Sequence, residues 1–164
     1  MQTGFGDSSA IHADGQDLQR SRPSQVSHQT RAVSDQQSAL LYKAFERSGG
    51  VASSDDVALL LRSHCDQPVS KLARWIARGE ILTFVWRSHT LIPLFQFEIG
   101  RCGPRDGIAS TILELAAAFD EVDIILWFAK PNALLAHRAP ADVALSNMHD
   151  VHQAARADRF IALG

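Results

Sequence analysis

The stretch from Ser53 to Phe97 limits the possible fold of this chain more than any other part of its sequence. Its hydrophobic periodicity predicts two short helices joined by a tight link, and then two strands that form a hairpin. This is the element order of a helix-turn-helix followed by a wing. The first functional hypothesis is therefore that the chain binds nucleic acid.

The second of these helices is predicted to begin at Pro68 and to end before Gly79. Proline is favoured in the first turn of a helix, and glycine just after its last residue. The apolar residues recur at helical spacing and form one stripe: Val69, Leu72, Ala73 and Ile76. The basic residues fall three and four apart on another face: Lys71, Arg74 and Arg78. This face favours contact with phosphates and base edges, and a basic face that is merely solvated stays open as the alternative.

Two further helices are predicted before this one. The nearer helix follows Ser53, which can cap it, and presents an apolar face. The farther helix runs from about Gln36 to Arg47, with Ser34 and Gln37 at capping-box spacing and a stop at Gly49-Gly50. Its apolar residues are expected to complete a small three-helix core: Leu40, Leu41, Ala44 and Phe45.

The predicted hairpin has strands at residues 81–86 and 91–97, where almost every side chain is β-branched, aromatic or large. Pro93 predicts that the return strand lies at a sheet edge, because proline donates no hydrogen bond to a neighbouring strand. Arg87 lies near the predicted tip and is the fourth candidate for contact with DNA.

Residues 99–164 are predicted to form a small all-helical lobe, because no stretch of them alternates polar and apolar residues. A nearly apolar helix stops at Pro131-Asn132, and within it Trp127 is expected to be a core side chain more than a ligand platform. Pro140 suits the first turn of a short helix, and a last helix is predicted from about Met148 to Ala162.

The expected fold is therefore mainly α with a small β-hairpin. We predict three parts: a disordered tail over residues 1–35, a winged helix-turn-helix over 36–98 and a small helical domain over 99–164. The tail is rich in Ser, Gln, Asp and Gly and poor in large apolar residues, a composition that is typical of disorder.

Composition excludes several other classes of protein. The sequence has neither the pattern of a signal peptide nor an apolar run long enough to span a bilayer, so we expect no membrane association. Its two cysteines, Cys65 and Cys102, are far apart and are expected to be reduced thiols in the cytoplasm.

Charge argues against a strong, self-sufficient DNA-binding protein. The formal net charge is −2, and residues 37–98 hold seven Lys and Arg against six Asp and Glu. Proteins that bind nucleic acid tightly without sequence preference are usually much more basic. Binding is therefore expected to be weak for one copy, and we predict a homodimer.

Groups with catalytic potential are sparse. His149 and His152 are three apart on a predicted helix, but no third or fourth ligand accompanies them, and a solvated helix face is the favoured interpretation. Cys65 has no His or Asp arrangement that would mark it as a nucleophile, and no glycine-rich phosphate loop is present. We predict a non-enzyme that has no cofactor and no metal site.

The sequence also resembles a known family. The stretches SSDDVALLL, VSKLARWIARGEILTF and LIPLFQFE are similar to the excisionase-like helix-turn-helix of many bacterial antitoxins, in which the hairpin ends in a P-x-FQF motif. The following segment resembles the toxin-binding domain of the Xre/MbcA/ParS antitoxin family. The matching residues are Trp127, Pro131, Asn132, Leu134 or Leu135, Pro140, Asp142, Val151, Ala154 and Ala155. Together the two parts cover about Val51 to Ala162.

This resemblance implies an antitoxin-like regulator that binds operator DNA and neutralises a RES-type or ADP-ribosyltransferase-type toxin. It implies partner contacts by Trp127, Pro131, Asn132 and Pro140. In the family the extreme C-terminus can reach the toxin's pocket, which here corresponds to the segment around Arg156, Arg159 and Phe160.

The chain departs from the family in the loop Ala136-His137-Arg138-Ala139, which has no glycine, so that any site needing a positive φ there is expected to be altered or strained. Two alternatives stay open: a transcriptional regulator that has no toxin, and a protein-interaction module whose helix-turn-helix is degenerate.

Overall fold

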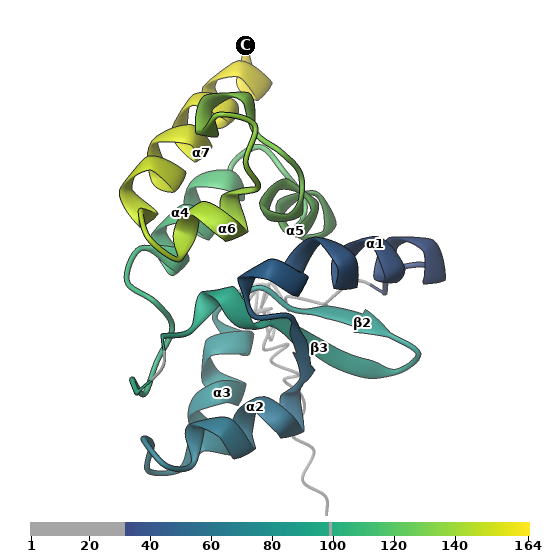
Figure 1. The fold of residues 1–164 in the computed structure, drawn as a ribbon, viewed down its shortest axis with the longest axis vertical. Coiled ribbons are helices and arrows are strands. Elements are labelled where there is room, and N and C mark those ends of the chain that lie inside the picture. Colours follow the sequence, from purple (N-terminus) through teal and green to yellow (C-terminus); the bar gives the residue numbers. More distant parts are fainter. Residues whose placement is uncertain (1–31, 99) are drawn as a thin grey trace, which may run out of the picture.

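The computed structural model describes residues 32–98 and 100–164 of the chain (Figure 1). The predicted disorder of residues 1–31 lies outside this part. The last residues of the predicted tail are ordered: Val33 is buried, and its N–H donates to the carbonyl of Val85 at 2.9 Å. The predicted tail therefore extends a few residues too far, because Val33 has apolar surface to bury.

Within the described residues the chain is mainly helical and has a small antiparallel sheet, which confirms the coarse fold class. The α helices are α1 (Asp35–Phe45), α2 (Ser54–Leu61), α3 (Pro68–Ala77), α4 (Ile108–Leu115), α5 (Glu121–Ala129), α6 (Pro140–Ala144) and α7 (Met148–Leu163). The strands are β1 (Val51–Ser53), β2 (Phe84–Trp86) and β3 (His89–Pro93). Short 3₁₀ helices are η1 (Glu46–Ser48), η2 (Leu94–Gln96) and η3 (Ala133–Leu135).

Local signals in the sequence account for most helix ends. Ser34 and Gln37 form the predicted capping box of α1, with hydrogen bonds of 3.1 and 3.0 Å. Ser53 caps α2 by accepting from the backbone N–H of Asp56 at 3.1 Å. Pro68 and Pro140 lie in the first turns of α3 and α6, as predicted.

The sheet has the order β1-β3-β2, so β3 is its central strand. The prediction that Pro93 marks an edge strand is wrong, because Pro93 is the last residue of β3 and its missing N–H interrupts no further ladder. The return strand also ends earlier than predicted, at the start of η2. The first strand, β1, was not predicted; it pairs Val51 with Pro93 and Ser53 with Leu91.

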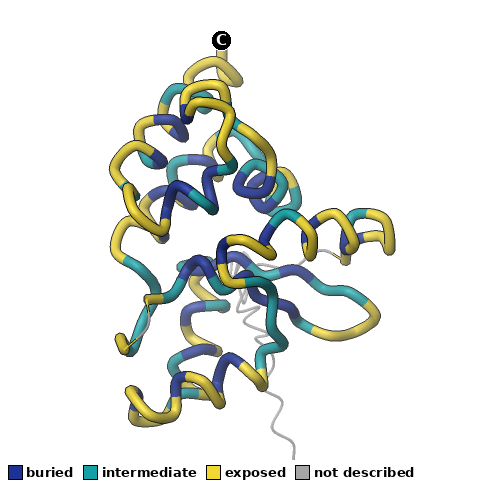
Figure 2. Tube along the Cα trace, viewed as in Figure 1, coloured by how far each residue is buried: buried dark blue, intermediate teal, exposed yellow. Residues whose placement is uncertain are grey.

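Both faces of the sheet are covered, which explains why consecutive residues of β3 are apolar. Leu91 belongs to the core cluster shared with α1 and the C-terminal helices, and Ile92 belongs to the cluster formed by α2 and α3. Figure 1 shows α1 on one side of the hairpin and α2 and α3 on the other. Figure 2 shows buried positions on both sides of the sheet.

The sequence predicts a three-helix core made by α1, α2 and α3. This prediction is wrong, because α1 packs against other elements. Its fully buried Leu41 and Phe45 join the larger cluster with α4–α7. The ring of Phe45 stacks on Phe95 of η2 at 5.5 Å, and Phe95 lies 5.1 Å from Phe128 of α5. This row of rings makes one continuous core across the predicted boundary at residue 98.

Cys65 and Cys102 form a disulfide, so the prediction of two reduced thiols is wrong. Their Cα atoms are 5.1 Å apart although 37 positions separate them in the sequence. Folding brings the link between α2 and α3 next to the loop that leads to α4, and sequence spacing alone could not reveal this contact.

The loop of residues 136–139, which has no glycine, contains two residues with positive φ. Ala136 and His137 have φ values of 54° and 59°, in the left-handed region that favours glycine. A bridge between Asn132 and Arg138 and the hydrogen bond from the N–H of His137 to the carbonyl of Asn132 hold this loop closed. The loop is therefore strained, and its hydrogen bonds offset part of that strain.

Candidate functional site

Helix α3 buries a different stripe from the one that the sequence predicts. Leu72 and Trp75 are buried, whereas Val69 is 68% exposed and Ala73 is also exposed. The large ring of Trp75 packs on Phe97, with centroids 6.3 Å apart, and this packing sets the rotation of the helix about its axis. The exposed face of α3 therefore carries Arg74 among small residues.

The three basic residues of α3 have different surroundings. Arg74 is exposed to solvent. Lys71 is partly buried, and its ammonium donates a hydrogen bond of 3.3 Å to Sγ of Cys102. Arg78 forms an ion pair of 3.5 Å with Glu80. Of the predicted trio, Arg74 is thus the residue best placed for a direct contact with a phosphate.

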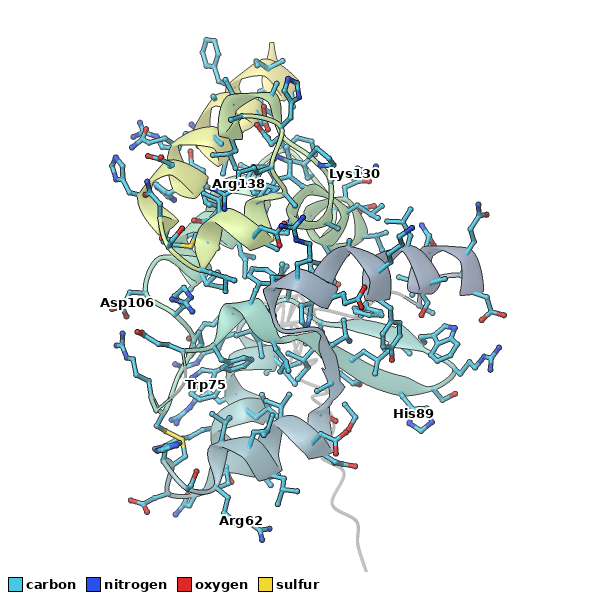
Figure 3. All side chains as sticks on the ribbon, in the orientation of Figure 1. Arg62, Trp75, His89, Asp106, Lys130 and Arg138 are labelled. Atoms are coloured by element: carbon cyan, nitrogen blue, oxygen red, sulfur yellow. A yellow bond between two sulfur atoms is a disulfide. The ribbon has the colours of Figure 1, made fainter. Side chains whose placement is uncertain are left out.

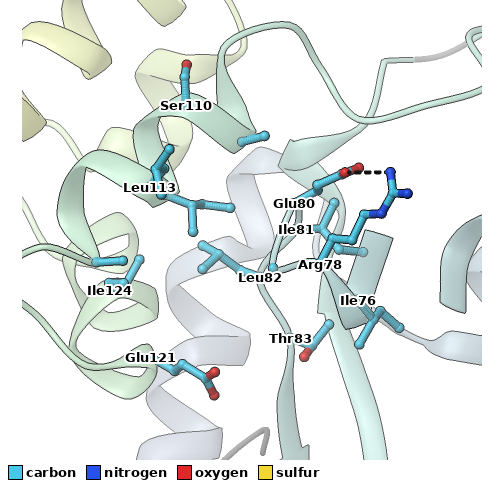
Figure 4. Close-up of a pocket in the computed structure, with 14 residues that line it drawn as sticks. Ile76, Arg78, Glu80, Ile81, Leu82, Thr83, Ser110, Leu113, Glu121 and Ile124 are labelled. Atoms are coloured by element: carbon cyan, nitrogen blue, oxygen red, sulfur yellow. Dashed lines mark ion pairs between the residues drawn. The ribbon is translucent and has the colours of Figure 1, made fainter. Parts of the chain in front are cut away.

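Arg78 and Glu80 also line a pocket of about 360 Å³ between the end of α3 and helix α4 (Figure 4). Its opposite wall is apolar and includes Leu82, Leu113 and Ile124. Figure 4 shows the ion pair at one side of this pocket, away from Leu113 and Ile124. Arg78 therefore has an ion-pair partner at the pocket, although its side chain is 64% exposed.

Arg87 lies at the tip of the hairpin, as predicted, where it and Ser88 adopt positive φ values of 46° and 66°. Its guanidinium lies 4.5 Å above the ring of Trp86 and 3.5 Å from the carboxylate of Asp35. The hydrogen bond from Nε1 of Trp86, and then the adjacent Arg87, hold the pKa of Asp35 below its usual value. Arg87 is therefore engaged at the start of α1, although its side chain is 65% exposed.

In the C-terminal lobe, two of the predicted partner-binding residues meet at one carboxylate. Oδ2 of Asp158 on α7 accepts a hydrogen bond of 2.7 Å from Nε1 of Trp127 and one of 2.6 Å from Nδ2 of Asn132. The side-chain oxygen of Asn132 accepts from the backbone N–H of Leu134 at 2.8 Å. These bonds attach the end of α5 and the start of η3 to the last helix.

A groove of about 600 Å³ surrounds this carboxylate, and we name it the α7 groove. Its polar floor is formed by Trp127, Asn132 and Asp158. Apolar side chains at its rim are strongly exposed: Leu134 is 57% and Ile161 is 72% exposed. Pro131 and Lys130 also line it, and Figure 3 labels Lys130 on the C-terminal lobe.

The remaining predicted partner-binding residues lie elsewhere. Pro140 is buried at the start of α6 and is a packing residue. Arg159 and Arg156 lie 3.1 Å and 4.0 Å from the carboxylate of Glu114 on α4, so both are directed at the chain's own lobe. Phe160 is 74% exposed and is not among the residues that line the α7 groove.

Sequence reasoning missed Asp158 and Ile161, which complete the groove. These residues are three apart, and that spacing places them on one face of a helix. This pattern was available in the sequence. What the sequence does not reveal is that Trp127, 31 positions earlier, meets Asp158.

Metal ligands do not gather anywhere in residues 32–98 and 100–164: no group of three or more His, Cys, Asp or Glu is placed to hold an ion. Nδ1 of His152 lies 3.1 Å from the hydroxyl of Thr111 on α4, while His149 is exposed. In the same part of the chain, every helix is too short or too polar to cross a bilayer.

Comparison of the chain with family models, with curated proteins and with solved structures found no match.

Proposed function

We propose that this chain is an antitoxin-like regulator with two binding surfaces. Its α7 groove binds and neutralises a toxin protein of the RES or ADP-ribosyltransferase type, and its α2–α3 pair binds operator DNA. On this proposal, α2, α3 and the β2–β3 hairpin act as a winged helix-turn-helix. The identity of the partner rests on the family resemblance of the sequence.

The observation that carries the proposal is the pair of hydrogen bonds that Asp158 accepts. They fix Trp127 and Asn132 against α7, so that the floor of the groove is rigid before any partner arrives. Leu134 and Ile161 then present exposed apolar surface beside this fixed polar centre. Rigid anchors surrounded by accessible apolar groups are typical of the centres of protein–protein interfaces.

Support for DNA binding comes from α3 and is weaker. Arg74 lies on an exposed helix face whose neighbours Ser70, Ala73 and Ala77 are small enough to allow close approach to a groove of DNA. Because the net charge of the chain is −2, one copy has little electrostatic attraction for DNA. We therefore propose that two copies bind one operator.

One alternative is favoured by a specific observation. Lys71, Arg78 and Arg87 each contact a group of the chain itself. Basic side chains that bind groups of their own chain are less available to DNA. This arrangement favours a protein-interaction module that has no DNA target. The DNA-binding experiment below distinguishes the two.

The partner surface is tested by co-expressing the chain with the product of the adjacent reading frame. We expect the two proteins to co-purify and the chain to relieve any growth arrest. Ile161→Asp should weaken the complex by about 2 kcal/mol, roughly thirtyfold in Kd, because it puts a charge at an apolar contact. Leu113→Asp is the matched control, since Leu113 is 75% exposed and lies on α4 outside the groove.

Equal loss of binding in both variants, or failure of the wild-type proteins to co-purify, would count against the groove as the partner site. Circular dichroism of each variant shows whether the fold is kept, so that a folding defect is not mistaken for a binding defect.

The DNA surface is tested by a gel shift with the DNA upstream of the chain's own reading frame. Arg74→Ala is expected to weaken binding about tenfold, because a lost Arg contact to DNA costs on the order of 1–3 kcal/mol. Arg138→Ala is the control, since Arg138 is an exposed arginine on the C-terminal lobe. If neither the wild type nor Arg74→Ala shifts this DNA, the protein-interaction module replaces the DNA-binding part of the proposal.

A further inference from the structure

We propose that the Cys65–Cys102 disulfide is a redox-controlled latch that holds the loop of residues 100–104, here named the latch loop, against α3. Reduction by a dithiol releases the tip of this loop and exposes Lys71. The latch is independent of the partner-binding surface. Only its effect on DNA affinity rests on the proposed function.

The latch loop is closed at its neck and tied at its tip. A bridge between Phe97 and Pro104 closes the neck, together with a hydrogen bond of 2.6 Å from the N–H of Arg105 to the carbonyl of Gln96. Cys102 lies at the tip, where the disulfide connects it to the link between α2 and α3. Figure 3 shows this sulfur–sulfur bond beside the helix pair, far from the C-terminal lobe.

While the latch is closed, the loop covers one flank of α3. Cys102 packs against the buried cluster that contains Cys65 and Trp75. A methyl group placed on Gly103 would lie 3.9 Å from Cζ2 of Trp75, so the loop passes close to that ring at Gly103. Lys71 lies on the same flank, and its ammonium donates to Sγ of Cys102.

The position of Lys71 also favours opening of the bond. A thiolate is stabilised by an adjacent cation, which makes a cysteine a better leaving group in thiol–disulfide exchange. As the bond opens, the charge that develops on Sγ of Cys102 lies beside this ammonium, and the thiolate is protonated once the loop moves away. A cation beside the departing sulfur therefore speeds the exchange, as in disulfides that act as switches rather than as permanent cross-links.

The chemistry is a two-electron exchange. A thiolate of the dithiol attacks Sγ of Cys102, the less buried of the two cysteines, and the electron pair of the broken bond leaves on Sγ of Cys65, which takes a proton. The second thiol of the reductant then attacks the mixed disulfide, expels the Cys102 thiolate, which takes the second proton, and forms the reductant's own disulfide. Two electrons and two protons pass from the dithiol to the two cysteines.

Opening of the latch adds a solvent-accessible cation, the ammonium of Lys71, to the surface of α3. With Cys102 released, the ammonium of Lys71 is free to reach solvent on the flank next to Arg74. One additional cation that can contact a phosphate raises the affinity for DNA and steepens its dependence on salt by about one unit of slope. The reduced protein is therefore the form with the higher DNA affinity.

The latch itself is tested without DNA by lysine acylation of the full chain, oxidised and after treatment with dithiothreitol. The chain has three lysines, and Lys43 and Lys130 are exposed and far from the disulfide in sequence, so they serve as internal controls. We expect the acylation rate of Lys71 to rise about fivefold on reduction while the rates of the two controls stay unchanged. The double variant Cys65→Ser, Cys102→Ser should show the fast rate under both conditions.

An unchanged Lys71 rate after complete reduction, verified by thiol alkylation, would overturn the proposal. So would a bond that resists dithiothreitol under conditions in which the protein stays folded. Because both forms of the wild type are compared, the test stands even if the double variant does not fold.

A second arm measures DNA affinity by fluorescence anisotropy of labelled upstream DNA. We expect the reduced form to bind about fivefold more tightly, and Lys71→Ala, which keeps both cysteines, to abolish this difference. Equal affinities in the two redox states of the wild type would contradict the consequence for DNA. Absence of binding in both states, combined with a faster Lys71 rate, would overturn the DNA-binding proposal while supporting the latch.

Discussion

Phe95→Ala is expected to lower the free energy of unfolding by about 4 kcal/mol, within the usual range for removing a buried phenyl ring. Phe95 is fully buried, and its ring contacts Phe45 of α1 on one side and Phe128 of α5 on the other. Its loss would leave a cavity between elements that the sequence assigns to two domains. Urea unfolding followed by circular dichroism measures this change.

The same variant tests whether the core is continuous. Trp75 reports on α3, and Trp127 reports on the C-terminal lobe. If the shared cluster makes the chain cooperative, both tryptophans should unfold at the same urea concentration, and both midpoints should fall in Phe95→Ala. The chain has a third tryptophan, Trp86, so variants that keep only Trp75 or only Trp127 allow each signal to be read separately.

Phe160→Ala is the matched control, because Phe160 is 74% exposed. Its replacement should change the free energy of unfolding by less than about 0.5 kcal/mol. A Phe95→Ala protein in which the Trp75 transition does not move, while the Trp127 transition does, would contradict cooperative unfolding of the chain and would show that the α2–α3 cluster unfolds separately from the core around Phe95.

The second large effect is expected for Gln96→Leu, at about 3 kcal/mol of lost stability. Gln96 is fully buried, and its Nε2 donates to the carbonyls of Leu82 and Pro93 at 3.0 Å each. Its Oε1 accepts from the N–H of Leu82. Leucine keeps most of the side-chain volume but removes all three bonds, so backbone groups of Leu82 and Pro93 lose their partner in the interior.

Gln153→Leu is the control for this substitution, since Gln153 is exposed on α7. Differential scanning calorimetry of the two variants measures the difference directly. Equal melting temperatures for Gln96→Leu and the wild type would show that the Gln96 bonds contribute nothing net, contrary to the expectation.

The starts of helices could be predicted from the sequence because their signals are local. The capping box at Ser34 and the prolines at Pro68 and Pro140 act within one helical turn, so neighbouring residues are sufficient to recognise them. Helix α7 begins at Met148 as predicted and ends within one residue of the predicted end.

Errors arose where a long-range contact decides the structure. The paired apolar residues Leu91 and Ile92 belong to a strand buried on both faces, which periodicity cannot distinguish from other short apolar runs. Strand β1 has three residues, too few to show alternation. The stripe on α3 was shifted because Trp75, omitted from the predicted stripe, occupies the buried face.

In the candidate sites, too, local patterns could be recognised in the sequence, whereas long-range contacts could not. Trp127 and Asn132 could be singled out from a motif, but Asp158 joins them through contacts across 31 and 26 positions. The basic residues of α3 could be found by spacing. Their pairing with Cys102 and Glu80 depends on the positions of side chains that spacing does not determine.

The central claim is that the α7 groove is the surface at which this chain binds a partner protein. Hydrogen exchange of the chain, alone and with the purified product of the adjacent reading frame, tests it most directly. We expect backbone exchange to slow at least tenfold, roughly 1.4 kcal/mol of added protection, in residues 130–135 and 158–163, and to stay unchanged in residues 68–78. Slowing confined to residues 68–78, or no slowing at a saturating partner concentration, would contradict the claim.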